Sequence, residues 1–119
     1  YILAGVGPLK SPGMARYMKN NVPGILVPDE IITKMTTAGK PWASKSKDEL
    51  TKEDKRARAA AWKETGIQIC IDLIQQLQKI KGVSGVHIMA IEWEEAVKPI
   101  VEGAGLYPRP VIEQPAAVA

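Results

Sequence analysis

Two apolar runs constrain the fold of this chain more than any other feature. Residues 1–10 (YILAGVGPLK) form an apolar run that ends in Gly and Pro, and residues 86–91 (VHIMAI) form a second one. Runs of this kind are typical of strands covered on both faces of a parallel sheet. His87, inside the second run, is expected to be a packed strand-layer histidine rather than an acid or base. With helical stretches between the runs, the sequence predicts parallel βα units.

Two short helices are predicted after the first run. Residues 12–21 follow Ser11, which can serve as their N-cap. Residues 30–35 follow Asp29, and acidic residues there favour the positive end of the helix dipole. Residues 36–47 contain Gly, Pro and Ser without an apolar period and are predicted to be a loop.

A long helix is predicted over residues 52–81. Thr51 and Asp54 form a start that resembles a capping box, and no Pro interrupts the stretch. An unbroken helix of this length would span about 45 Å. We therefore expect a kink or break near Gly66. Cys70 lies within the apolar face and is expected to act as an inert, small hydrophobic side chain.

The last part of the chain combines an amphipathic helix with a proline-rich end. The helix is predicted over residues 92–102, and Pro99 is expected to kink it or to delay its regular part. From residue 106 onward three Pro residues predict an extended or partly disordered segment. The predicted domain organisation is a unit of βα elements over residues 1–110 and a Pro/Ala-rich tail over residues 111–119.

Composition excludes several classes of protein. One Cys and one His in 119 residues supply neither an intramolecular disulfide nor a self-contained zinc site. The absence of a long apolar run and of a signal-like start favours the cytoplasm and no membrane span. The net charge is +3, and the basic stretch over residues 45–63 also carries acidic residues, which indicates a solvated helix face rather than a nucleic-acid site.

Two parallel strands leave exposed faces and unpaired edges, so they do not form an independent sheet. The chain also begins inside the first apolar run, at Tyr1. We therefore expect it to be a segment of a larger structure, with the remaining strands supplied by the same or a separate chain.

Four segments together resemble methylenetetrahydrofolate reductases, most closely the single-domain bacterial members found in acetogens and related anaerobes. These segments are residues 5–11 (GVGPLKS), 20–23 (NNVP), 69–74 (ICIDLI) and 85–93 (GVHIMAIEW). The resemblance implies the C-terminal portion of a (β/α)8 barrel, with the seventh and eighth strands and the helices that follow them. It also implies reduction of 5,10-methylenetetrahydrofolate to 5-methyltetrahydrofolate through a flavin, FAD or FMN, with reduced nicotinamide as a possible donor.

In such a barrel the chemistry takes place at the carboxyl ends of the strands. The resemblance therefore implies substrate contacts from Lys10, Ser11 and Met14 after the first strand, with folate or nicotinamide. After the last strand, where other members carry an Asn-Arg pair, this chain has Glu92 and Trp93. Trp93 would stack on the ligand, and Glu92 would accept a hydrogen bond from the pterin.

Each of these residues also has a structural alternative. Lys10 can be a solvated charge, and Ser11 can serve only as a helix cap. Trp93 can form a wall of the barrel mouth, which is the opening at the carboxyl ends of the strands, or it can form a subunit contact. Glu92 can cap the helix that follows. The sequence leaves these alternatives open.

The resemblance places the flavin mainly in parts of the barrel outside this segment, so the segment alone is expected to be inactive. A rival hypothesis is a non-catalytic interaction module that keeps the strands and has lost the chemistry. Some members of the family work beside a small zinc-bearing partner subunit, and the helical surface over residues 51–81 offers room for such a contact. An oligomer is also expected.

Overall fold

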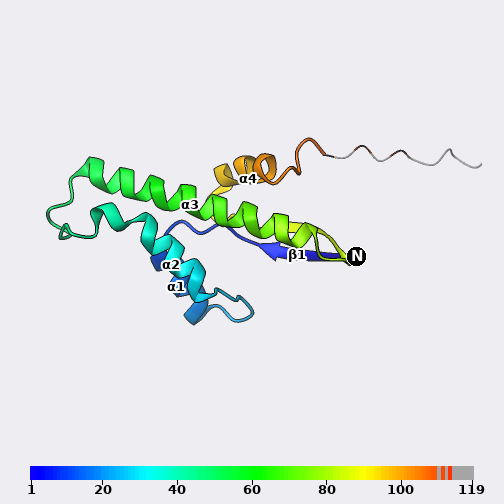
Figure 1. Ribbon diagram of the computed structural model, residues 1–119, viewed down its shortest axis with the longest axis horizontal. Coiled ribbons are helices and arrows are strands. Elements are labelled where there is room, and N and C mark those ends of the chain that lie inside the picture. The colour runs from blue at the N-terminus through cyan, green and yellow to red at the C-terminus, as the bar shows by residue number, and fades with distance from the viewer. Residues whose placement is uncertain (110, 112, 114–119) are drawn as a thin grey trace, which may run out of the picture.

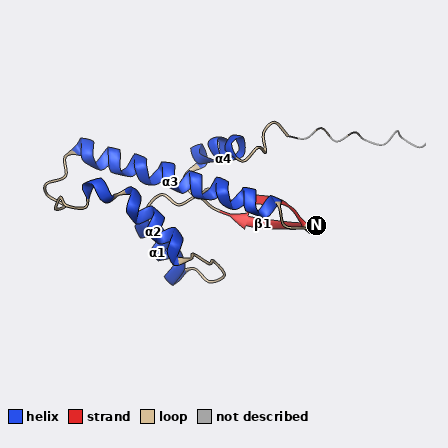
Figure 2. Cartoon of the chain, viewed as in Figure 1, coloured by secondary structure: helices blue, strands red, loops and turns tan. Residues whose placement is uncertain are grey.

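The chain folds into a mixed α/β unit that contains a two-stranded parallel sheet and four α-helices (Figure 1, Figure 2). The computed structural model describes residues 1–109, 111 and 113, so most of the predicted tail lies outside the described residues. The elements are β1 (Ile2–Val6), α1 (Pro12–Asn21), α2 (Asp29–Ala38), the 3-10 turn η1 (Lys40–Trp42), α3 (Lys52–Gln78), β2 (Val83–Ile88), the 3-10 turn η2 (Glu94–Ala96) and α4 (Val97–Gly103).

β1 and β2 pair in parallel, as the two apolar runs predict. The second strand begins at Val83 and ends at Ile88, three residues earlier at each end than the predicted 86–91. The register explains the early end, because Val6, the last residue of β1, lies opposite Ile88. One further hydrogen bond, from Met89 N to Val6 O at 2.8 Å, continues the ladder into the loop.

α3 is the crossover between the strands and runs antiparallel to them (Figure 1). Its 27 residues span about 40 Å, whereas the five residues of β1 span about 17 Å. The N-terminal half of α3 therefore extends beyond the carboxyl ends of the strands. There α2 packs against α3, and α1 packs against α2. Over the described part of the chain, none of the helices has both the length and the apolar content that a membrane crossing requires.

α2 is longer than the sequence predicts. It continues to Ala38 and is followed by η1, so the loop predicted over residues 36–47 is wrong in its first half. The hydroxyls of Thr36 and Thr37 each donate to the carbonyl oxygen four residues earlier, at 2.8 Å, and so stay within the helix. Met35 is fully buried, and its packing holds this last part of the helix in place.

α3 continues without interruption through Gly66, so the break expected there does not occur. The reason for glycine is space: a Cβ built on Gly66 would lie 1.8 Å from the carbonyl oxygen of Leu9, in the loop after β1. The helix backbone therefore rests directly on this loop. α3 ends at Gln78, three residues before the predicted end at residue 81.

The buried side chains form two clusters, one on each side of this contact. The first cluster lies between the sheet, the C-terminal half of α3 and α4, and it contains Val6, Cys70, Ile71, Ile74, Trp93, Ala96, Ile100 and Ala104. The second lies under α1 and α2 and contains Leu9, Ala15, Val27 and Met35. Cys70 is buried in the first cluster, as predicted.

One face of the sheet is uncovered in the described part of the chain. Leu3 is 63% exposed and Met89 is 44% exposed, and both belong to this face. His87 is also exposed, so the expectation of a packed histidine is wrong for the described residues. A parallel sheet with an uncovered apolar face is unusual, because such sheets are normally covered on both sides.

The helix predicted over residues 92–102 begins late. η2 comes first, and the regular helix α4 starts only at Val97. Pro99 is the third residue of α4, where its missing N–H breaks no intrahelical hydrogen bond. The predicted delay of the regular part is therefore confirmed.

We expect Gly66→Ala to destabilise the protein, although Ala is normally favoured over Gly in a helix by about 1 kcal/mol. The added methyl group would overlap the Leu9 carbonyl oxygen, and overpacking costs about 1–3 kcal/mol. Chemical denaturation measures the change in the free energy of unfolding. Cys70 gives a second readout, because burial raises the pKa of its thiol to about 11 and alkylation should accelerate once the core opens.

Gly13→Ala is the matched control for this substitution. The nearest atom to a Cβ at Gly13 is Ser11 Oγ at 3.7 Å, an ordinary contact distance. This variant should keep or raise the denaturation midpoint. A midpoint for Gly66→Ala equal to or above that of the unsubstituted protein would contradict the packing described for α3.

Candidate functional site at the carboxyl ends of the strands

The loops after β1 and β2 lie side by side, because the two strands are parallel neighbours. They cover residues 7–11 and 89–93. Ligands of open α/β sheets and of barrels bind at this edge, where the carboxyl ends of the strands meet. All five residues selected from the sequence lie on these loops or in the first turn of α1: Lys10, Ser11, Met14, Glu92 and Trp93.

Lys10 connects the two loops. Its Nζ donates a hydrogen bond to the backbone carbonyl oxygen of Glu92, at 2.8 Å. Glu92 has a φ of 53°, in the left-handed region that residues other than glycine rarely adopt. The structure thus brings two predicted site residues together, through the main chain of Glu92 rather than its exposed carboxylate.

Ser11 and Met14 shape the start of α1. Ser11 Oγ accepts a hydrogen bond from the Met14 backbone N–H at 3.1 Å, which confirms Ser11 as the N-cap. The backbone N–H of Lys10 donates to the Met14 sulfur at 3.5 Å. The Ser11 hydroxyl keeps its own hydrogen for a further partner, because a hydroxyl is both donor and acceptor.

Trp93 points inward. It is 8% exposed and belongs to the cluster that contains Ile74 and Ile100. On its other side the Lys63 Nζ lies 5.9 Å from the ring centroid, within the range of a cation–π contact. The ring therefore forms part of the wall beneath the mouth, and its stacking on a ligand stays a prediction.

Two glycines of the first strand and its loop lie close to Met89. A Cβ at Gly5 would lie 3.4 Å from Met89 Cε, and one at Gly7 would lie 3.0 Å from Met89 O. A side chain at Gly7 would therefore crowd the Met89 carbonyl oxygen, whereas the contact at Gly5 is of ordinary length. Over residues 1–109, 111 and 113, no group of three metal-ligating side chains occurs.

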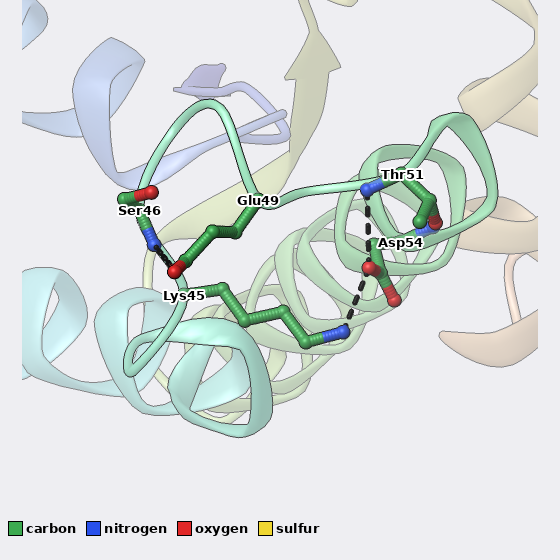
Figure 3. Close-up of polar contacts among 5 residues, drawn as sticks. All are labelled: Lys45, Ser46, Glu49, Thr51 and Asp54. Atoms are coloured by element: carbon green, nitrogen blue, oxygen red, sulfur yellow. Dashed lines mark hydrogen bonds and ion pairs between the residues drawn. The ribbon is translucent and has the colours of Figure 1, made fainter.

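An ion pair and several hydrogen bonds to carboxylates stabilise the turn over residues 45–51, before α3 (Figure 3). The Lys45 ammonium lies 2.8 Å from Asp54 Oδ2, and Asp54 also completes a capping box with Thr51, as predicted. Lys45 and the Thr51 backbone N–H lower the pKa of Asp54. The Ser46 backbone N–H donates to Glu49 Oε2 at 2.8 Å and lowers the pKa of that carboxyl.

Two open clefts near the N-terminal half of α3 contain side chains that the sequence analysis did not select. One, of about 600 Å³, lies between α2 and α3 and is lined by Thr33, Lys34, Thr37, Ala38, Glu64, Thr65, Gln68, Ile69 and Asp72. The other, of about 260 Å³, includes Arg58 and Trp62, with the Arg58 Cζ 4.8 Å from the Trp62 ring centroid. Arg58 and Trp62 are four residues apart, and this spacing in a predicted helix indicates that their side chains lie next to each other.

We expect Asp54 to titrate below the ordinary range of an aspartate, chiefly because Lys45 donates to it. A lowered folded-state pKa stabilises the fold above the unfolded-state pKa, and this stabilisation is lost as the pH falls through the folded-state pKa. Titration of the side-chain carboxyl by NMR measures the value, and Lys45→Met should raise it.

Glu49 is the internal control for this titration, because its pKa is lowered chiefly by the Ser46 backbone N–H. It should shift much less than Asp54 in the Lys45→Met variant. An Asp54 pKa that does not change in that variant would contradict the ion pair as the main cause.

Comparison of the chain with protein-family models, with curated proteins and with solved structures finds no match. A function has therefore to be inferred from the residues themselves and from the geometry of the two parallel strands and their helices.

Proposed function

We propose that this chain is the C-terminal part of a flavin-dependent barrel enzyme that reduces 5,10-methylenetetrahydrofolate to 5-methyltetrahydrofolate. In this proposal β1 and β2 are the last two strands of the barrel, and α3 and α4 cover its outside. The order of the four resembling segments supports it, and so does the parallel pairing of adjacent strands through a helical crossover.

The hydrogen bond from Lys10 Nζ to the Glu92 carbonyl oxygen is the observation that carries the proposal. It joins two neighbouring loops at the edge of the sheet where a barrel enzyme binds its substrate. The exposed apolar face with Leu3 and Met89 supports it further, because the inner face of a barrel is covered by side chains from the other strands.

The flavin, when bound, would supply the hydride transfer, and it would be held mainly by parts of the barrel outside this segment. Lys10 uses one of its three donors on Glu92 and has two left for an anionic or carbonyl group of the folate or nicotinamide. The Ser11 hydroxyl can donate beside it. These residues would bind and orient the substrate, while Trp93 supports the loop from below.

The complete enzyme that contains this segment should carry the visible absorbance of an oxidised flavin and reduce methylenetetrahydrofolate. Lys10→Met should raise the KM for the folate several-fold and leave the flavin content unchanged, because Lys10 faces the substrate side of the mouth. Absorbance spectra and steady-state kinetics of the complete enzyme measure both quantities.

Lys98→Met is the matched control, because Lys98 is 81% exposed on α4 and away from the mouth loops. It should leave the KM unchanged. Trp93→Ala is a poorer test, since loss of a buried aromatic side chain costs about 3–5 kcal/mol of stability by itself. An unchanged folate KM in the Lys10→Met variant would remove Lys10 from the site.

A non-catalytic interaction module is the second candidate, and the uncovered sheet face favours it equally well. A complete protein, with all the strands of the sheet present, that lacks flavin and reductase activity would support this candidate and contradict the first. The uncovered face would then be covered by strands of the partner protein.

A further inference from the structure

A pocket at the junction of α1, α2, η1 and α3 combines two arginines with two tryptophans. Its volume is about 260 Å³, and its walls include Arg16, Thr36, Gly39, Trp42, Arg58 and Trp62. These residues come from four separate elements, so the pocket exists only in the folded chain. We call it the arginine–tryptophan pocket.

The pocket carries uncompensated positive charge. No acidic residue lines it. The ion pairs found among the described residues involve Lys19, Lys45 and Lys98, and neither arginine of the pocket takes part in them. Among the described residues, the Arg16 guanidinium makes one long hydrogen bond, from Nη2 to Thr36 Oγ1 at 3.4 Å.

Two buried donors in the walls of the pocket have no partner within the described chain. These are Arg58 Nε and Trp62 Nε1. A buried donor without an acceptor costs about 1–3 kcal/mol, and an arginine cannot avoid the cost by losing its proton. Both atoms are closed off from solvent, so an occupant of the pocket would bind the other guanidinium nitrogens of Arg58.

The Trp62 side chain in the wall of the pocket contacts both Arg58 and Gly39. Trp62 holds the Arg58 guanidinium against its ring, with 4.8 Å from Cζ to the centroid. A Cβ at Gly39 would lie 2.6 Å from Trp62 Nε1, while the φ of Gly39 is −90°, which any residue can adopt. Glycine is therefore needed at position 39 for space, so that the end of α2 closes against the indole.

We propose that the arginine–tryptophan pocket binds an oxyanion group, a carboxylate or a phosphate, carried by a small molecule. Guanidinium groups bind such oxyanions through paired, charge-assisted hydrogen bonds. The volume is below the roughly 300–1,000 Å³ of pockets for drug-sized ligands, and it suits a single oxyanion group. This inference does not depend on the proposed reductase function.

Isothermal titration of the native protein tests the proposal, in chloride buffer at constant ionic strength. The probes are inorganic phosphate, phenyl phosphate and benzoate. We expect saturable binding of one ion per chain for at least one of them. Arg58→Gln and Arg16→Gln should each weaken this binding about tenfold or more, because each removes a charged hydrogen bond.

Arg56→Gln is the matched control, because Arg56 is an exposed arginine of α3 that does not line the pocket. It should leave the affinity unchanged. Arg16 is exposed, so the Arg16→Gln variant is expected to fold. It therefore still tests the proposal if the Arg58→Gln variant fails to fold.

The three probes distinguish the source of the oxyanion. Binding of inorganic phosphate alone would indicate a free phosphate, whereas preference for benzoate or phenyl phosphate would indicate an aromatic carboxylate or phosphate ester. Absence of saturable binding for all three, or an equal loss in the Arg56→Gln variant, would overturn the proposal. None of these readouts involves flavin or folate, so they are separate from the test of the reductase.

Discussion

The close approach of α3 to the loop after β1 sets the spacing of the whole structure. The Leu9 carbonyl oxygen lies so near Gly66 that no side chain fits at that position. This contact lies between the two buried clusters, and a single helix of 27 residues contributes to both of them. Any displacement of α3 at Gly66 would therefore loosen the packing on the sheet and the packing under α1 and α2 together. The close contact at Gly66 fixes the position of α3, and α3 in turn fixes the carboxyl ends of the strands that pack against it.

The same contact explains why the two mouth loops have defined conformations without many side-chain interactions. Leu9 is fixed from behind by α3, and Lys10, the next residue, reaches across to the Glu92 carbonyl oxygen. Met89 N continues the strand ladder with one further bond to Val6. The left-handed turn at Glu92 then sends the backbone carbonyl toward Lys10 and directs Trp93 into the core. The arrangement of the mouth is thus determined largely by main-chain groups.

Local features of this fold could be predicted from the sequence, and features that depend on distant contacts could not. The caps at Ser11 and at Thr51 involve hydrogen bonds between residues three apart, so the residue types alone indicate them. Gly66 looks like a helix breaker until Leu9 is placed beside it, more than fifty positions away along the chain. The inward direction of Trp93 depends likewise on a turn in the left-handed region that no local pattern indicates. For the candidate site, the sequence indicated that the selected residues follow the two strands, and the structure brings these loops side by side. It did not indicate that Glu92 contributes its main-chain carbonyl oxygen to a hydrogen bond with Lys10.

On the uncovered face of the sheet, glycines alternate with large apolar side chains, and this shape suits packing against a further layer of side chains. Two glycines lie next to its two large apolar residues: a Cβ at Gly85 would be 3.2 Å from Leu3 Cδ2, and one at Gly5 would be 3.4 Å from Met89 Cε. Alternation of glycine with large side chains leaves hollows between ridges, and barrel interiors fill such hollows with side chains from alternate strands. A face intended for water would carry polar residues at these positions instead. The shape of this face thus favours burial against further strands. Both candidate functions require such burial.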